Sequence, residues 1–326
     1  MAASETRPSS PVSTVSPLLQ ELTSLLTEQN NPATWDIDLS DTQRILELIN
    51  AEDCKVAPAV AREIPSIAAA VDHIVAAFYR GGRLIYVGAG TSGRLGIIDA
   101  AECPPTFGSP PEMVQAIIAG GDAAIFRAQE GAEDRREDGA AAIAARQVTA
   151  NDVVCGIAAS ARTPFVLGAL EEAHRRGATT ILITTNPRQK VQQMEIARYA
   201  HILICPEVGP EVIAGSTRMK SGTAQKLVLN MLTTAAMIRI GKTYHNIMVD
   251  LQPTNQKLLE RSKHILMLLA DVDYATAEHT LRETQGNTKL ALFMLLANLP
   301  ADQARRLLQK HQGRLREALL ARHTER

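Results

Sequence analysis

The chain has 326 residues, of which 45% are hydrophobic and 21% charged, enough for one large domain or two ordinary ones. Its 34 basic and 35 acidic side chains leave a formal net charge of −1, which argues against a broadly basic nucleic-acid-binding surface. Aromatic residues make up only 3%, too few for a base-stacking platform, so we expect no nucleic-acid partner.

No uncharged apolar run reaches the ~18 residues that cross a membrane, and residues 1–17 contain no apolar segment of a signal peptide. These features predict a cytoplasmic protein without a membrane partner. The histidines show no metal-ligand spacing, and no C-x-x-C pair occurs among the scattered cysteines Cys54, Cys103, Cys155 and Cys205. We therefore expect neither a metal site nor a disulfide scaffold.

The N-terminal quarter of the chain predicts a tail followed by helices. Residues 1–17 are rich in serine and proline, which is typical of a disordered tail. Residues 18–80 carry helical patterns and are expected to pack on the core. Ser40 and Gln43 form a capping-box pattern, Pro65 suits the first turn of a further helix, and Gly81-Gly82 ends that helix.

Short apolar runs then alternate with helical segments. We predict strands at Leu84–Val87, Val114–Ile118, Val153–Ile157, Thr180–Thr184 and Ile202–Ile204. Helices such as Ala132–Arg146 and Pro164–Arg176 lie between most of them. Continuous apolar strands between helices predict an α/β fold with a doubly wound, five-stranded parallel sheet. This unit spans residues 74–240 and ends in a long helix from about Lys220 to Ile240, and residues 255–320 predict a small C-terminal helical unit.

The predicted first strand leads into the turn Gly88-Ala89-Gly90-Thr91-Ser92-Gly93, which a helix follows. Backbone N–H groups and the dipole at a helix N-terminus favour a bound phosphate. The turn fits the dinucleotide pattern G-x-G-x-x-G, but no acidic residue directly follows the second strand to bind a ribose. The hydroxyls of Thr91 and Ser92 therefore favour a compact phosphate monoester, and the alternative is a plain tight turn.

Two further loops carry candidate binding residues. Ser160, Arg162 and Thr163 follow the third strand and precede Pro164, which suits the first position of a helix. Because the carboxyl ends of parallel strands meet at one edge, we expect this loop and the glycine-rich turn to share a phosphate pocket. The alternative is a capping hydroxyl beside a solvated arginine. In the segment 209–225 the candidates for binding an anionic ligand are Ser216, Thr217 and Lys220. The alternative is that this segment is an ordinary loop.

Two carboxylates are candidates for acid–base chemistry. Glu102 precedes Cys103-Pro104-Pro105, and the prolines predict that the helix ends there. A carboxylate near a helix C-terminus is disfavoured by the dipole, which indicates a functional reason for Glu102. Glu133 shares a predicted helical face with other acidic residues, so a solvated acidic face is its alternative, and composition does not select it from Glu130, Asp134 and Glu137.

Four long blocks resemble the N-acetylmuramic acid 6-phosphate etherase family: GGRLIYVGAGTSGRLGIIDAAECPPTFG, AIIAGGDAAIFRAQEGAED, VVCGIAASARTPFVLGAL and GPEVIAGSTRMKSGTAQKLVLNML. The resemblance covers roughly residues 25–319 and implies a sugar isomerase (SIS) type of sandwich, shared with the glucokinase regulatory protein. The segment GNTKLALFMLL resembles the ubiquitin-associated-like helical tail of the family.

The resemblance implies a lyase that cleaves the lactyl ether of N-acetylmuramic acid 6-phosphate by elimination and then hydration, in peptidoglycan recycling and amino-sugar catabolism. Glu102 matches the proton donor and Glu133 the second catalytic glutamate, which we take as the base. Ser92, Ser160 and Thr163 match the loops that hold the phosphate. The resemblance further implies a homodimer with the pocket near its interface, and a reaction that needs no cofactor or metal.

Two alternatives remain open. An aldose–ketose sugar-phosphate isomerase would interconvert sugars without releasing lactate. A non-catalytic sugar-phosphate-sensing regulatory protein would bind its ligand tightly without turnover, and the presence of both Glu102 and Glu133 speaks against it.

The chain departs from the family pattern at three positions. Ala101 stands where the family usually has serine, Asp122 where it has glutamate, and Ala161 where it has glycine. If position 161 needs a positive φ, alanine is strained there by ~1 kcal/mol or more. Its methyl group would also lie where the backbone approaches the phosphate, so we expect Ala161 to affect phosphate affinity.

Overall fold

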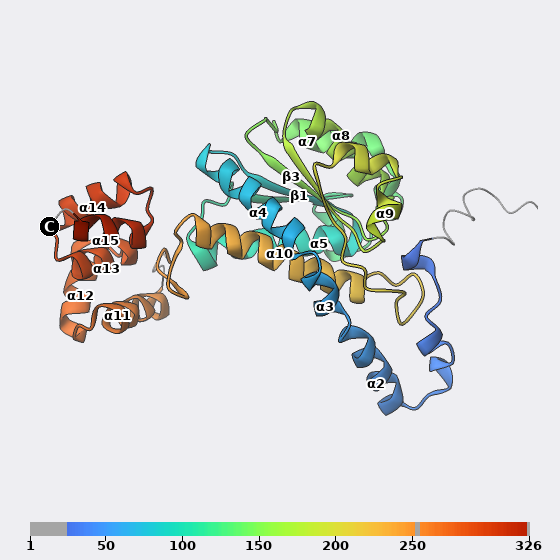
Figure 1. Ribbon diagram of the computed structural model, residues 1–326, viewed down its shortest axis with the longest axis horizontal. Helices are drawn as coiled ribbons and strands as arrows, with labels where there is room; N and C mark the ends of the chain where they lie inside the picture. The colour runs from blue at the N-terminus through green and yellow to red at the C-terminus, as the bar shows by residue number, and fades with distance from the viewer. Residues whose placement is uncertain (1–24, 252–254, 325–326) are drawn as a thin grey trace, which may run out of the picture.

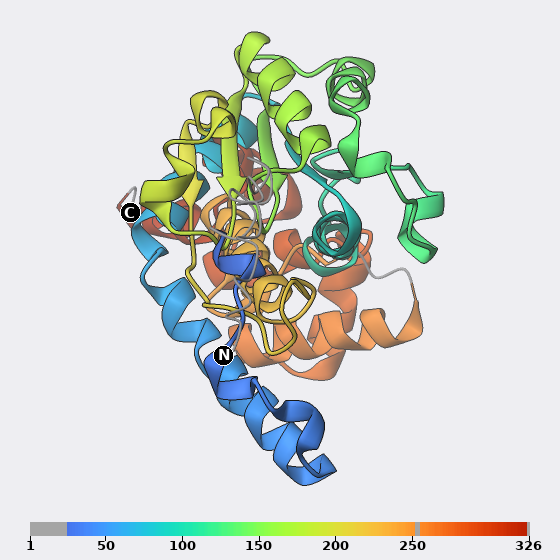
Figure 2. The same ribbon diagram turned by 90° about the vertical axis from the view of Figure 1, so that its right-hand side faces the viewer.

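Helices precede the sheet along the chain. The computed structural model describes residues 25–251 and 255–324, so the tail predicted at residues 1–17 lies outside the described residues. The first elements in the described part of the chain are three 3₁₀ helices and then three α-helices: η1 (Leu26–Glu28), η2 (Pro32–Thr34), η3 (Ile37–Leu39), α2 (Thr42–Asp53), α3 (Val56–Ala61) and α4 (Ile64–Tyr79). Helix α2 extends away from the body of the molecule (Figure 1 and Figure 2).

The starts of α2 and α4 test two sequence predictions. The Asp41 carboxylate caps α2 by accepting a hydrogen bond from the backbone N–H of Arg44 at 2.8 Å, so the capping box predicted at Ser40 and Gln43 was wrong by one residue. Pro65 lies in the first turn of α4, as predicted, because the missing N–H of proline costs nothing there.

Five parallel strands form one sheet within the described residues, as predicted. Their order is β2-β1-β3-β4-β5. The predicted bounds hold to within one residue, and the strand expected at Thr180–Thr184 begins one residue earlier. The strands are β1 (Leu84–Gly88), β2 (Val114–Ile118), β3 (Val153–Ile157), β4 (Thr179–Ile183) and β5 (Ile202–Ile204).

Helices cover both faces of this sheet, which gives the doubly wound α/β architecture (Figure 1). Helices α4, α5 (Gly90–Phe107) and α10 (Lys220–Arg239) pack on one face, where alternate β1 side chains such as Tyr86 are buried. Helices α7 (Arg136–Ala145) and α8 (Pro164–Arg175) pack on the other, against Ile85. Short helices α6 (Ala123–Phe126), α9 (Arg188–Val191) and η5 (Glu195–Tyr199) fill the connections.

Helix α5 contradicts the prediction that the double proline ends it. The helix continues through Pro104 and Pro105 to Phe107. It ends at Gly108, whose left-handed backbone (φ 58°) lets its N–H bond to the carbonyl of Pro104 at 2.9 Å. The prolines therefore occupy the last turns, where buried Cys103 and Phe107 hold the helix against the core.

The acidic segment is likewise not one continuous helix. Residues predicted as a helix over Ala132–Arg146 form a short 3₁₀ turn, η4 (Ala132–Asp134), and then α7. Arg135 separates the two with an extended backbone (φ −94°, ψ 96°). The expectation that Glu133 shares one helical face with Glu137 was therefore wrong.

The C-terminal helices gather around a core of their own. They follow a small antiparallel pair, β6 (Thr243–Tyr244) and β7 (Ile247–Met248), that the sequence did not predict. Their buried side chains, Phe293 and Leu266 among them, belong to neither sheet core. They stand to one side of the sheet in Figure 1 and are α11 (Gln256–Ala270), α12 (Tyr274–Glu283), α13 (Thr288–Ala297), α14 (Ala301–Lys310) and α15 (Leu315–Thr324). None of the helices in the described ranges has the length and apolar character of a membrane span.

Candidate active site

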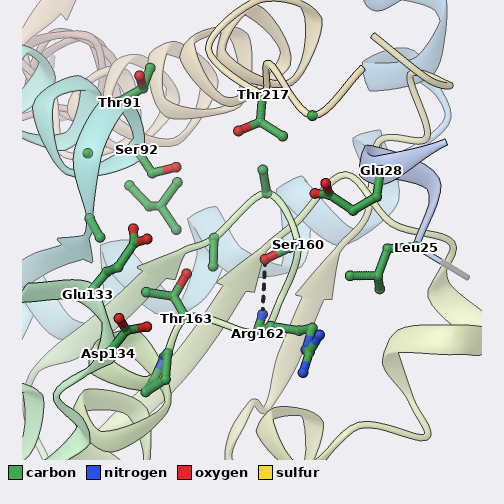
Figure 3. Close-up of a pocket in the computed structure, with 17 residues that line it drawn as sticks. Leu25, Glu28, Thr91, Ser92, Glu133, Asp134, Ser160, Arg162, Thr163 and Thr217 are labelled. Atoms are coloured by element: carbon green, nitrogen blue, oxygen red, sulfur yellow. Dashed lines mark hydrogen bonds between the residues drawn. The ribbon is translucent and has the colours of Figure 1, made fainter. Parts of the chain in front are cut away.

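The candidate site lies at the carboxyl edge of the sheet, between the neighbouring strands β1 and β3. The chain leaves β1 for β2 on one side and later enters β3 on the other, so this edge is the switch point at which open α/β sheets bind ligands. A pocket of about 470 Å³ opens there (Figure 3). That volume suits a small metabolite such as a sugar phosphate.

The structure brings most of the predicted binding residues into this pocket. They come from the turn after β1, the loop after β3 and the loop before α10, and are Thr91, Ser92, Ser160, Arg162, Thr163 and Thr217. The turn after β1 opens helix α5, and the loop after β3 opens helix α8. Two helix N-termini therefore face one pocket, and their dipoles and backbone N–H groups favour a phosphate there.

A buried glutamine that sequence reasoning missed holds the first of these loops. The Ser92 hydroxyl donates to Oε1 of Gln225 on α10 at 2.9 Å. Gln225 is only 1% exposed, and among the described residues its Nε2 has no hydrogen-bond partner. Rotation of this amide would turn Nε2 toward Ser92 and leave the serine O–H to donate to a phosphate. The sequence around Gln225 carries no motif that would signal this contact.

The loop after β3 is fixed by residues that follow β4. The carbonyl of Ala159 accepts hydrogen bonds from the Thr184 hydroxyl at 2.8 Å, the backbone N–H of Thr185 at 3.0 Å and the side-chain amide of Asn186 at 3.3 Å. Within the loop, Ser160 Oγ accepts from the N–H of Arg162 at 3.3 Å. Sequence reasoning missed this support, although three consecutive polar residues after a buried strand are a usable signal.

Ala161 has the positive φ angle that the sequence analysis gave as the condition for backbone strain. Its φ is 60°, in the left-handed region. The residue is only 2% exposed and belongs to the core that α8 also lines, outside the pocket lining. Its methyl group therefore lies outside the pocket lining, which corrects the expectation that this methyl affects phosphate affinity by direct approach.

We predict that Ala161→Gly stabilises the protein without tightening phosphate binding. The substitution removes the strain of an alanine at positive φ, but glycine also gives the unfolded chain more entropy. The net effect should raise the free energy of unfolding by roughly 0.5–1 kcal/mol. Urea denaturation measures this change, and calorimetry with inorganic phosphate measures the affinity. A large gain in phosphate affinity would contradict the buried position of the methyl group.

Lys220 does not reach the pocket. Its ammonium is buried, lies 2.6 Å from Glu52 Oε2 on α2 and donates to the carbonyl of Val208 at 2.9 Å. The expectation that Lys220 binds the ligand was therefore wrong, because a partner on α2 holds its charge inside the protein. Ser216 also lies outside the pocket lining, whereas its neighbour Thr217 belongs to it.

The two predicted catalytic glutamates are not brought together within one chain. Glu133 lines the pocket, as does Asp134. Glu102 is exposed on α5, outside the pocket lining and ~18 Å along the helix axis from Gly90. A third pocket carboxylate, Glu28 of η1, was missed by sequence reasoning because the segment around it carries no regular pattern.

A buried carboxylate fixes the helix that carries Glu102. Asp99 accepts hydrogen bonds from the Tyr86 hydroxyl at 2.9 Å and from the Thr233 hydroxyl of α10 at 3.3 Å. Burial raises the pKa of Asp99, although these hydrogen bonds and nearby Lys226 oppose the shift. Asp99 thus joins α5 to β1 and α10 one turn before Glu102. Among the described residues, no cluster of His, Cys, Asp and Glu side chains has the arrangement of a metal site.

Two comparisons relate the sheet-bearing part of the chain to known proteins. Residues 66–174 match the family described as the glucokinase regulatory protein N-terminal SIS domain. Among solved structures, a phosphoheptose isomerase from Francisella tularensis is 19% identical, with a TM-score of 0.43, over 62% of this chain and 98% of its own. The family match places residues 66–174 in the class of the sugar isomerase (SIS) domains.

Curated relatives narrow the class to one family. The N-acetylmuramic acid 6-phosphate etherase of Salinibacter ruber is 56% identical over 93% of this chain and 96% of its own. Those of Edwardsiella ictaluri and Clostridioides difficile are 53% and 52% identical, over 91% and 93% of this chain and 98% of their own. The chain therefore belongs to the N-acetylmuramic acid 6-phosphate etherase family, whose members are lyases.

Proposed function

We propose that the protein cleaves the lactyl ether of N-acetylmuramic acid 6-phosphate to give N-acetylglucosamine 6-phosphate and D-lactate. The observation that carries this proposal is the 56% identity, over 93% of the chain, to a protein named for that etherase activity. The pocket between two helix N-termini supports it, because such a site suits a phosphate monoester. We place the reaction in the cytoplasm, in peptidoglycan recycling and amino-sugar catabolism.

The chemistry requires a base and an acid. The C2 proton of the sugar becomes acidic only beside an aldehyde, so the substrate reacts in its ring-opened form. The base removes this proton, and the C3–O bond to lactate breaks while the acid protonates the departing oxygen. Water then adds at C3 of the unsaturated aldehyde and C2 regains a proton, which gives N-acetylglucosamine 6-phosphate with a hydroxyl at C3. Each step is general acid–base catalysis.

Glu133 is the base in this proposal, and Glu102 is the acid that also activates the incoming water. Glu133 is suited to its role because its carboxylate points into the pocket, toward Ser92 (Figure 3). The hydroxyls of Ser92, Ser160 and Thr163 hold the phosphate at the ends of α5 and α8. The substrate thus lies with C2 facing Glu133.

We further propose that two copies of the chain associate and that each supplies Glu102 to the pocket of its partner. The support is that Glu102 lies outside the pocket of its own chain. The packed helices α5 and α10 also carry exposed apolar side chains, which an interface would cover: Ile98, Met231 and Ile238. Burial between the copies would also favour the protonated acid that the reaction needs.

The test is lactate release from N-acetylmuramic acid 6-phosphate by the purified protein in heavy-oxygen water. Release of D-lactate, with the label at C3 of the product sugar, is the expected result, because water supplies the new C3 hydroxyl. If the protein binds the sugar phosphate but releases no lactate, the proposal fails and the sensing role replaces it. Interconversion of sugar phosphates without lactate would instead indicate an isomerase.

A further inference from the structure

We propose that Glu28 is a substrate-binding residue whose carboxylate accepts hydrogen bonds from the sugar part of the ligand, away from its phosphate. Glu28 lines the pocket on the side opposite Glu133, near Ser160 and Thr217, and its carboxylate is directed toward the pocket (Figure 3). The assignment rests on the proposed sugar-phosphate substrate for the identity of the ligand.

Hydrogen bonds to residues far along the chain hold the segment around Glu28 in position. The backbone N–H of Leu26 donates to Oδ1 of Asn186 at 3.0 Å, and the N–H of Gly215 donates to the carbonyl of Thr27 at 3.2 Å. Leu25 is completely buried and also lines the pocket. Asn186 supports the loop after β3 as well, so the segment with Glu28 is tied to the predicted phosphate loop.

A second set of contacts fixes the chain just beyond Glu28. The side-chain amide of Asn31 donates to the carbonyl of Pro210 at 3.2 Å, and the Thr34 hydroxyl donates to the carbonyl of Val212 at 2.9 Å. Residues 25–34 therefore run beside the loop that precedes α10. Glu28 is itself exposed at the rim of the pocket, so these contacts of its neighbours are what fix its position relative to a ligand.

The surroundings of Glu28 leave its carboxylate available. Among the described residues, its hydrogen-bond donor is the neighbouring Thr27 hydroxyl at 3.3 Å, and no cation pairs with it. Oε2 comes within 3.3 Å of the position that a Cβ would take at Gly215, which has φ 78° and lets the loop pass close to the carboxylate. A loop glycine therefore makes room for this carboxylate at the rim of the pocket.

The charge of Glu28 identifies the kind of group it binds. An ionised carboxylate has acceptor oxygens only, so its partner must be a donor such as a sugar hydroxyl or amide N–H. It repels the phosphate, which instead finds hydroxyls and backbone N–H groups at the ends of α5 and α8. The two ends of the pocket thus distinguish the two ends of a sugar phosphate and set its direction relative to Glu133.

The experiment compares two probes, N-acetylglucosamine 6-phosphate and inorganic phosphate, by calorimetry with wild-type protein and Glu28→Gln. The loss of a charged acceptor should weaken binding of the sugar phosphate at least tenfold. Binding of inorganic phosphate should stay unchanged or become tighter, because a repelling charge is removed. In turnover, KM should rise while kcat changes little, since these contacts do not involve the reacting bonds.

Glu112→Gln is the matched control, because Glu112 is an exposed glutamate before β2, at the opposite edge of the sheet. It should leave both affinities unchanged. Equal weakening of both probes in Glu28→Gln would indicate damage to the fold and overturn the assignment, as would an unchanged affinity for the sugar phosphate. The two possible failures differ: missing lactate release by wild-type protein overturns the proposed reaction, whereas these binding results overturn the role of Glu28.

Discussion

Glu133→Gln is expected to slow both lactate release and proton exchange at C2 of the substrate, whereas Glu102→Gln slows lactate release but keeps the exchange. The base acts in the first step, and the acid is needed only when the ether bond breaks. Each loss should amount to about 10²- to 10⁴-fold, the usual contribution of a positioned acid or base. Deuterium incorporation followed by NMR reports the exchange, and a coupled assay reports the lactate.

The opposite pattern would reverse the two roles. Exchange that is lost in Glu102→Gln but kept in Glu133→Gln would make Glu102 the base. Glu130→Gln is a suitable control, because it makes the same change in an exposed glutamate of the same acidic segment, outside the pocket lining. It should leave both measurements unchanged.

The same two variants also test the shared site. If each copy supplies Glu102 to its partner, a mixed dimer of Glu102→Gln and Glu133→Gln has one pocket with both glutamates and one with neither. After subunit exchange in an equal mixture, activity should return to about one quarter of the wild-type value. Two inactive variants that stay inactive after proven exchange would contradict the contribution in trans.

Lys220→Met is expected to give the largest loss of stability, about 3–5 kcal/mol, because it leaves Glu52 buried without its main partner. Lys220 also begins α10, where the buried Glu211 carboxylate accepts hydrogen bonds from the N–H groups of Lys220 and Ser221 at 3.0 and 2.9 Å. Urea denaturation at pH 7 measures the loss. Adding Glu52→Gln should recover most of it, since the unpaired charge is then gone.

The same pair gives the stability a defined pH dependence. Burial by itself raises the pKa of Glu52, but hydrogen bonds from Lys220 and Lys55 outweigh this effect and hold the pKa below its usual value of 4.5. The pair therefore stabilises the fold fully above that value, and its contribution is lost as the pH falls through the lower pKa of the folded state. Arg44→Met, at an exposed ion pair with Glu47, should change the stability little. If Lys220→Met lowered the free energy of unfolding as little as Arg44→Met, the assigned role of the buried Lys220–Glu52 pair would be wrong.

The sheet could be predicted from the sequence because burial on both faces leaves a simple pattern. The runs Val153–Ile157 and Ile202–Ile204 are continuously apolar, and the structure gives both strands the same bounds. The pocket loops could be located for a related reason. Polar residues that directly follow a buried strand lie at the carboxyl edge of a parallel sheet, so Ser92 and Ser160 were expected to meet.

The remaining features depend on contacts between distant residues. Lys220 resembles a ligand-binding residue in its loop, and only the approach of Glu52, 168 positions away, makes it structural. Glu28 enters the pocket because Leu26 bonds to Asn186, which lies 160 positions away. The double proline was misread because local rules for helix ends ignore the packing of Cys103 and Phe107.

The polarity of the pocket has a consequence for how a ligand arrives. Among the described lining residues, the carboxylates of Glu28, Glu133 and Asp134 outnumber the guanidinium of Arg162. These described side chains carry a net negative charge, so a dianionic ligand would gain no net long-range attraction from them and would depend on short-range neutral dipoles. Dissolved salt would screen this net repulsion, so we expect the encounter rate to rise with ionic strength, whereas it falls for a lysine-lined phosphate site.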